Sequence, residues 1–116
     1  MIDRIWSKAS VIEGLAPDVF RKDSCGAAMM KNKFGDTSSP FGWTIDHIYP
    51  RSKGGDDNEV NLRAMQWQNN VSKGHDFPLY NSAVVFDSIE NIPSVREFRV
   101  NSQKLAELSK IYSIEL

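Results

Sequence analysis

The stretch GWTIDHIYPRSKGGDDNEVNLRAMQWQNNVSK, residues 42–73, contains four segments with different patterns. Residues 43–48 alternate between apolar and polar side chains, which predicts a short β-strand. Residues 50–58 are rich in turn formers, and their Gly pair permits tight bends and positive φ angles. A second short strand is predicted at 62–65, followed by about two turns of helix at 66–73. This order would bring together three distant polar positions: Asp46-His47, Asn61 and Asn70.

The same stretch resembles the ββα-metal core of the HNH endonucleases, in the variant whose third letter is Asn rather than His. The residues that carry the resemblance are Asp46-His47-Ile48, Pro50, Ser52-Lys53-Gly54-Gly55, Asn61-Leu62, Trp67, Asn69-Asn70 and Lys73-Gly74. Each short motif is common alone, whereas their joint order and spacing are specific. The resemblance covers about a third of the chain firmly, and residues 21–41 more loosely.

This resemblance implies an α+β fold, with a ββα-metal (HNH/His-Me finger) core, a short antiparallel hairpin, and flanking N- and C-terminal helices. We expect a single domain over 1–116, with the nuclease core in 21–75 and a C-terminal extension, 76–116, packed on it. Outside the motif, the patterns predict a helix over 2–14, a strand within 27–34 that pairs with the 43–48 strand, strands at 83–86 and 94–100, and a final helix capped by Asn101-Ser102. The apolar stripe of that last helix consists of Leu105, Leu108, Ile111 and Tyr112.

The resemblance also assigns chemistry to four of the motif residues. His47 matches the general base of the family, and an imidazole can take a proton from water near pH 7. Asp46 and Asn70 match the two protein ligands of one divalent metal ion. Because both offer oxygen, Mg²⁺ or Mn²⁺ is favoured over zinc. Asn61 matches the residue that pins the loop, and its amide is expected to hold His47 in place.

Four cations near the motif are candidates for binding nucleic-acid phosphates: Lys73, Arg51, Lys53 and Arg63. Lys73 follows Asn70 by three positions and would share its helix face. A solvated surface cation explains Lys73 and Arg51 equally well. The chain has a net charge of −1, so we expect weak binding to nucleic acid by the protein alone. His75 is not expected in the metal shell.

Composition narrows the classes of protein to which the chain could belong. The chain has 116 residues, 41% hydrophobic and 25% charged, which is typical of a globular domain. It contains no apolar run long enough for a membrane span, and its first residues lack the pattern of a signal peptide. The single Cys25 cannot form an intrachain disulfide, so a cytoplasmic location is expected. Because no second Cys pair is present, no structural zinc is expected.

The sequence therefore predicts a metal-dependent endonuclease that hydrolyses DNA phosphodiester bonds, with RNA left open as a substrate. Two alternatives remain. One is a catalytically inactive module that keeps the fold and binds nucleic acid. The other is an accessory protein that cuts only inside a complex. The C-terminal helix is expected to pack on the core, with a homodimer or protein-partner contact as the alternative.

Overall fold

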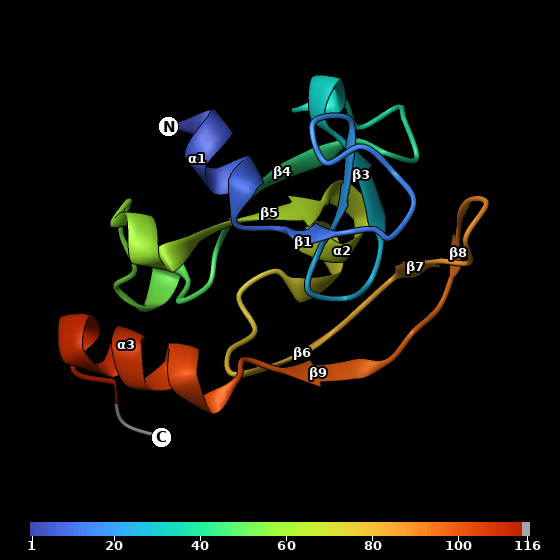
Figure 1. The fold of residues 1–116 in the computed structure, drawn as a ribbon. Helices are drawn as coiled ribbons and strands as arrows, with labels where there is room; N and C mark the ends of the chain where they lie inside the picture. The colour runs from blue at the N-terminus through green and yellow to red at the C-terminus, as the bar shows by residue number, and fades with distance from the viewer. Residues whose placement is uncertain (115–116) are drawn as a thin grey trace.

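The central unit of the protein is a β-hairpin followed directly by a helix, seen in a computed structural model that describes residues 1–114 (Figure 1). Strand β4 (Trp43–His47) pairs antiparallel with β5 (Leu62–Gln66), from Trp43 opposite Gln66 to His47 opposite Leu62. Helix α2 (Trp67–Lys73) starts immediately after β5. The strand, loop, strand and helix predicted for residues 43–73 are therefore present, in an α+β fold with small antiparallel sheets.

The boundaries of α2 follow from local chemistry. The side chain of Gln66 accepts a hydrogen bond from the backbone N–H of Asn69, which satisfies one of the unpaired donors at the helix start. The helix ends at Gly74, which adopts a positive φ of 51° and donates its N–H to the carbonyl of Asn70. These two ends fix which side chains α2 turns toward β4.

The N-terminal helix is shorter than predicted. Helix α1 (Ile2–Ser7) buries Ile5 and Trp6, and the chain then turns into β1 (Ser10–Val11). The prediction of a helix over 2–14 is therefore wrong beyond Ser7. The Arg21 guanidinium accounts for the early end, since it donates to the carbonyls of Ser7 and Ala9 and holds this segment beside β2 (Phe20–Lys22).

Residues 27–34 also differ from the prediction. Strand β3 (Ala28–Met30) pairs with β2 in a three-stranded sheet, order β1-β2-β3, and not with β4. A short 3₁₀ turn, η1 (Lys31–Lys33), follows, and the contact with β4 is a single parallel bridge between Phe34 and Trp43. The indole of Trp43 donates to the carbonyls of Met30 and Lys31, so a side chain rather than a strand ladder joins the two segments.

Residues 79–99 form a long arm of two strand pairs (Figure 1). Strand β6 (Leu79–Asn81) pairs with β9 (Glu97–Arg99), and β7 (Val84–Phe86) pairs with β8 (Asn91–Pro93). The strands predicted at 83–86 and 94–100 correspond to β7 and β9, each shorter than expected. The loops between β4 and β5 contain two further 3₁₀ turns, η2 (Arg51–Lys53) and η3 (Glu59–Asn61).

Helix α3 (Ser102–Tyr112) ends the described chain, and Asn101 caps it as predicted, accepting the N–H of Lys104 on its Oδ1. Leu105 and Leu108 of the predicted stripe are buried, whereas Ile111 is 40% exposed.

Two hydrophobic clusters cover opposite faces of the hairpin, because neighbouring side chains of a strand alternate between faces. One cluster contains Met65 of β5 and draws in the arm and α3: Cys25, Ile48, Met65, Tyr80, Val100, Leu105 and Leu108. The other contains Ala64 of β5 and joins α1 to the hairpin: Ile5, Trp6, Met29, Trp43, Leu62 and Ala64. No helix within residues 1–114 is both long and apolar enough to cross a bilayer.

Candidate functional site

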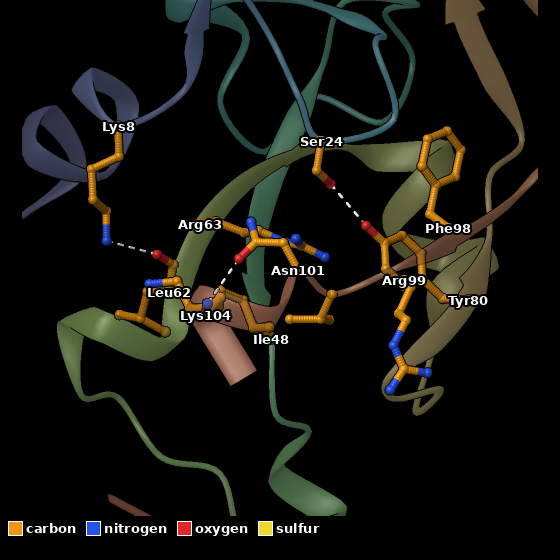
Figure 2. Close-up of a pocket in the computed structure, with 11 residues that line it drawn as sticks. Lys8, Ser24, Ile48, Leu62, Arg63, Tyr80, Phe98, Arg99, Asn101 and Lys104 are labelled. Atoms are coloured by element: carbon orange, nitrogen blue, oxygen red, sulfur yellow. Dashed lines mark hydrogen bonds between the residues drawn. The ribbon is translucent and has the colours of Figure 1, made fainter. Parts of the chain in front are cut away.

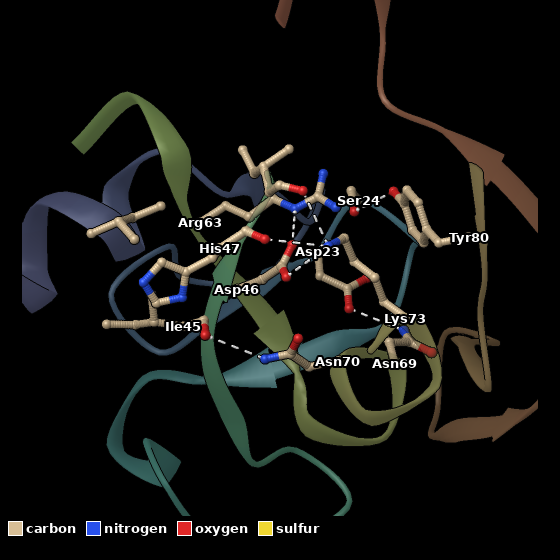
Figure 3. A network of polar contacts seen from close by, with 12 residues as sticks. Asp23, Ser24, Ile45, Asp46, His47, Arg63, Asn69, Asn70, Lys73 and Tyr80 are labelled. Atoms are coloured by element: carbon tan, nitrogen blue, oxygen red, sulfur yellow. Dashed lines mark hydrogen bonds and ion pairs between the residues drawn. The ribbon is translucent and has the colours of Figure 1, made fainter. Parts of the chain in front are cut away.

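Asp46 lies on β4 with its carboxylate enclosed between two cations (Figure 3). The side chain is 3% exposed. Its Oδ2 accepts a hydrogen bond from Nε of Arg63 at 2.9 Å, and its Oδ1 lies 3.2 Å from Nζ of Lys73. Asp46 is therefore a buried anion with two positive partners, one from β5 and one from α2.

The imidazole of His47 is held by a carboxylate from the loop between β4 and β5. Its Nε2 lies 2.8 Å from Oδ1 of Asp57, which Arg51 also contacts through Nη2 at 2.6 Å. The hydrogen bond with His47 and the nearby charge of Arg51 lower the pKa of the Asp57 carboxyl. An ionised Asp57 favours the tautomer with the proton on Nε2, which leaves the lone pair on Nδ1. Nδ1 has no hydrogen-bond partner among residues 1–114.

Asn61 closes the loop that carries Asp57. Its Oδ1 accepts the N–H of Tyr49 at 2.7 Å, and its Nδ2 donates to the carbonyls of Tyr49 at 3.0 Å and Asp56 at 3.1 Å. These are the hydrogen bonds to loop backbone that the sequence predicts for Asn61. Gly55 packs against the same point, where an added Cβ would lie 1.8 Å from the Tyr49 carbonyl oxygen. Only glycine fits there without opening the loop.

Asn70 projects from α2 toward β4. Its Nδ2 donates to Oγ1 of Thr44 at 2.8 Å and to the carbonyl of Ile45 at 3.3 Å. With the amide nitrogen engaged in this way, the Oδ1 of Asn70 accepts no hydrogen bond from residues 1–114.

A single groove of about 190 Å³ brings the predicted residues together. Asp46, His47 and Asn70 all line it, and the remaining lining residues are Ile45, Pro50, Arg51, Gly74 and His75. The hairpin supplies the acid and the imidazole, and the helix supplies the amide. His75, left aside in the sequence, therefore lies at the same groove, where its Nδ1 is 3.1 Å from Oγ of Ser52.

Two of the four predicted phosphate-binding cations are turned inward. Lys73 is 0% exposed and donates to the carbonyls of His47 and Ile48 as well as pairing with Asp46. Burial lowers the pKa of Lys73, and the Asp46 carboxylate offsets this only in part. The predicted contact between Lys73 and a surface phosphate is therefore wrong. Arg63 pairs with Asp46 and does not line the groove, so any phosphate contact of Arg63 lies outside this groove. Arg51 and Lys53 remain exposed beside it.

The donor set at the groove fits a hard divalent cation that keeps most of its water. Asn70 offers a free amide oxygen, and each carboxylate oxygen of Asp46 can accept a second partner beside the cation it already contacts. Lys73 and Arg63 oppose a further positive charge at Asp46. In the part of the chain that the structure describes, no three His, Cys, Asp or Glu side chains converge on a common point. Any metal at the groove would thus depend on Asp46, Asn70, water and substrate.

Three residues that organise the site were not predicted. Asn69 is fully buried: its Nδ2 donates to Asp23 and to the carbonyl of Val84, and its Oδ1 accepts the N–H groups of Ala83 and Val84. Asp23 also accepts three backbone N–H groups, from Cys25, Ala27 and Gln66. Asp57 is the third. The adjacent Asn69-Asn70 pair is the sequence feature that could have pointed to Asn69. Nothing in the sequence indicates that Asp57, rather than Asp56, contacts His47.

Cys25 is buried beside Asp23, and burial raises the pKa of its thiol to about 12. The thiol therefore stays protonated near neutral pH and acts as a small core residue.

Comparison with protein-family models gave no match, and comparisons with curated proteins and with solved structures gave none either.

Proposed function

We propose that the chain is a metal-dependent endonuclease that hydrolyses phosphodiester bonds in DNA, with RNA retained as a possible substrate class. The observation that carries this proposal is the shared groove of Asp46, His47 and Asn70, in which a carboxylate backs the imidazole. An acid, an imidazole with a free nitrogen and an amide oxygen are the groups that metal-assisted hydrolysis requires.

In this proposal His47 is the general base. Its Nδ1 takes a proton from the attacking water, while Asp57 accepts the Nε2–H and stabilises the imidazolium that forms. Asn61 keeps the loop closed, so that Asp57 stays within reach of the ring. Asp46 and Asn70 would hold the divalent cation. That cation supplies Lewis-acid stabilisation of the scissile phosphate and of the departing 3′ oxygen.

A second candidate is a protein of the same fold that binds nucleic acid without cutting it, or that cuts only with a partner. The pairing of both Asp46 oxygens with Arg63 and Lys73 favours it, since these cations already neutralise the carboxylate. The exposed cations at the groove are also few, because Lys73 is buried and Arg63 does not line the groove. A partner would then have to supply the missing positive charge.

Cleavage of supercoiled plasmid separates the two candidates. The wild type is incubated with Mg²⁺, with Mn²⁺ and with EDTA, beside His47→Ala and the matched variant His75→Ala from the same groove. We expect cutting that requires metal, disappears in His47→Ala and persists in His75→Ala. Metal-dependent cutting that survives in His47→Ala would exclude His47 as the base. No cutting under any of these conditions would favour the non-cutting candidate.

Asp57→Asn provides a second test of the proposed base. The amide can no longer hold the Nε2–H tautomer as a carboxylate does, so we expect the rate to fall by about 10- to 100-fold. Binding of uncut DNA should not weaken, because Asp57 contributes no positive charge and its replacement leaves Arg51 free for phosphate. Asp18→Asn, an exposed carboxylate distant in sequence from the motif, is the control and should leave the rate unchanged.

A further inference from the structure

Several positive charges line a second pocket, which shares no lining residue with the His47 groove. This pocket has a volume of about 340 Å³ and is formed where α1, β5 and the start of α3 meet the arm (Figure 2). Four cations line it: Lys8, Arg63, Arg99 and Lys104. None of its lining residues is acidic. It is of the size that accommodates small ligands rather than single ions.

Arg63 gives this pocket a partly buried charge, and its side chain is 19% exposed. Its Nε contacts Asp46, whereas its Nη2 is buried and has no hydrogen-bond partner in residues 1–114. Asp46 is shared with Lys73, so one carboxylate faces two cations and the buried cluster has a net charge of +1. Nη2 itself is covered by protein, so an anion in the pocket would meet the exposed part of the guanidinium instead.

Lys8 and Lys104 add further positive charge to the lining of the pocket. Nζ of Lys8 donates to the carbonyls of Glu59 and Leu62, and Nζ of Lys104 donates to the carbonyl of Val60. Burial and the charge of Lys104 lower the pKa of Lys8. Lys104 also forms an ion pair with Glu107 at 3.7 Å, and Glu59 is engaged by Arg4. Glu59 and Glu107 are the carboxylates that neighbour the two lysines, and neither of them lines the pocket.

The other wall of the pocket is aromatic. Tyr80 and Phe98 line it with their rings 6.0 Å apart and inclined by 22°, and Figure 2 shows them across the pocket from Lys8 and Lys104. The guanidinium of Arg63 lies 5.3 Å from the Tyr80 ring centroid, between the cationic and the aromatic sides. A ligand that fits both walls has an anionic group at one end and a flat, largely apolar group at the other.

We propose that this pocket binds a nucleotide unit, with its phosphate toward Lys8, Arg63 and Lys104 and its base against Phe98. Arg99, which is exposed at the rim, would contact the phosphate from the solvent side. Arg and Lys are the usual partners of phosphate, and aromatic rings stack on bases of any identity. The nucleotide can be free or the end of a nucleic-acid chain, since both present the same chemistry. The proposal does not depend on cleavage at the His47 groove.

The test is a titration of the full chain followed by amide chemical shifts in NMR spectra. The probes are AMP, adenosine, inorganic phosphate and a short 5′-phosphorylated DNA strand. We expect saturable shifts near Arg99, Asn101 and Lys104 with AMP or with the strand, and at least about tenfold weaker binding of adenosine and of phosphate. Saturation by AMP would identify a free nucleotide as a ligand, and saturation by the strand alone would identify a nucleic-acid end.

Variants separate this pocket from general surface charge. The double variant Arg99→Gln, Lys104→Gln should weaken binding about tenfold or more, because Gln keeps a hydrogen-bond donor but removes the charge. Lys110→Gln, an exposed position further along α3, should have no effect. His47→Ala should also bind normally, which distinguishes this proposal from the proposed cleavage. Absence of saturable binding by both AMP and the strand, equal binding of inorganic phosphate, or an equal loss in Lys110→Gln would overturn it.

Discussion

The two adjacent asparagines of α2 face different parts of the molecule. Asn69 makes four hydrogen bonds inside the protein, to Asp23 and to the start of β7, whereas Asn70 holds Thr44 and Ile45 and lines the groove. One residue joins α2 to the arm, and the other presents an oxygen to the site. Neighbouring positions on a helix point about 100° apart, which is how one dipeptide serves both.

Alanine variants of Asn69 and Asn70 should affect different properties: protein stability in the first and cleavage in the second. Asn69→Ala leaves the N–H groups of Ala83 and Val84 unpaired in the interior, so we expect a loss of about 2–4 kcal/mol in the free energy of unfolding. Asn70→Ala should cost less than about 1 kcal/mol and should abolish metal-dependent cleavage. Urea unfolding and plasmid cleavage measure the two effects. Full cleavage by Asn70→Ala would remove this residue from the site.

Lys73 provides a test of Asp46 as a metal ligand. Its ammonium lies 3.2 Å from Oδ1 of Asp46 and repels a cation bound to the same carboxylate. Lys73→Met removes that charge while Arg63 still pairs with Oδ2, so the affinity for Mn²⁺ should rise by about tenfold. Calorimetric titration with Mn²⁺ measures the affinity, with Lys53→Met as the exposed control. An unchanged affinity in Lys73→Met would show that Asp46 does not bind the metal.

At the residue scale, the sequence identifies which side chains meet but not the electrostatic environment of each one. Asp46, His47 and Asn70 were predicted from their order, and all three line one groove. The inward turn of Lys73 could not be predicted, because exposed and buried lysines follow the same helical spacing. Its burial depends on an acid, Asp46, that only the folded hairpin places beneath it.

Helix α3 is tied to the loop between β4 and β5 by side-chain hydrogen bonds at both of its ends, since Lys104 donates to the Val60 carbonyl and Tyr112 contacts Asp56. The hydroxyl of Tyr112 donates to the carboxylate of Asp56, the neighbour of Asp57. This hydrogen bond lowers the pKa of Asp56, while burial and the same bond raise the pKa of Tyr112. The contact therefore links the stability of the loop to pH through two groups shifted in opposite directions.

The sign of this dependence can be worked out for each group. Because the pKa of Asp56 is lower in the folded state, its contribution is present above about pH 3.9 and is lost as pH falls through the folded pKa. Because the pKa of Tyr112 is raised, its contribution is present below about pH 10 and is lost as pH rises through the folded pKa. We expect Tyr112→Phe to be less stable than wild type near pH 7. Urea unfolding from pH 2 to 8 should show the difference vanishing in acid, and a constant difference would contradict this account.

At the element scale, prediction succeeded where the residues that determine a helix, strand or turn lie close together in the sequence. The alternation of residues 43–48, the Asx-rich loop and the cap at Asn101 all act over a few residues. The end of the helix predicted at 2–14 and the pairing partner of the strand within 27–34 were predicted wrongly, because the residues that decide them are distant in the sequence. Arg21 ends α1, and β2 pairs with both β1 and β3, which no local pattern encodes.

The distribution of charge over the whole molecule limits how it meets a polyanion. The net charge is −1, and of the four cations predicted at the groove only Arg51 and Lys53 are exposed, with Arg51 already contacting Asp57. A double-logarithmic plot of DNA affinity against salt should therefore have a slope of about −2. A slope of about −4 would instead indicate that Arg99 and Lys104 also contact the DNA.

Fluorescence anisotropy with a labelled DNA duplex measures this slope. Lys53→Gln should reduce its magnitude by about 1, since one phosphate contact is removed. Lys110→Gln, at an exposed position on α3, should leave it unchanged. A slope near zero for the wild type would show that the chain does not bind DNA through phosphate contacts.

Gly55 has a consequence for how this sequence can vary. Its missing Cβ lets the chain pass against the Tyr49 carbonyl at the point that Asn61 fastens, and every other amino acid would place an atom there. In a library randomised at each position and selected for cleavage, Gly55 should accept no replacement at all, although it performs no chemistry. The neighbouring Lys53 should accept many. The pattern of tolerated substitutions across this loop would thus be set by backbone space as much as by reactive groups.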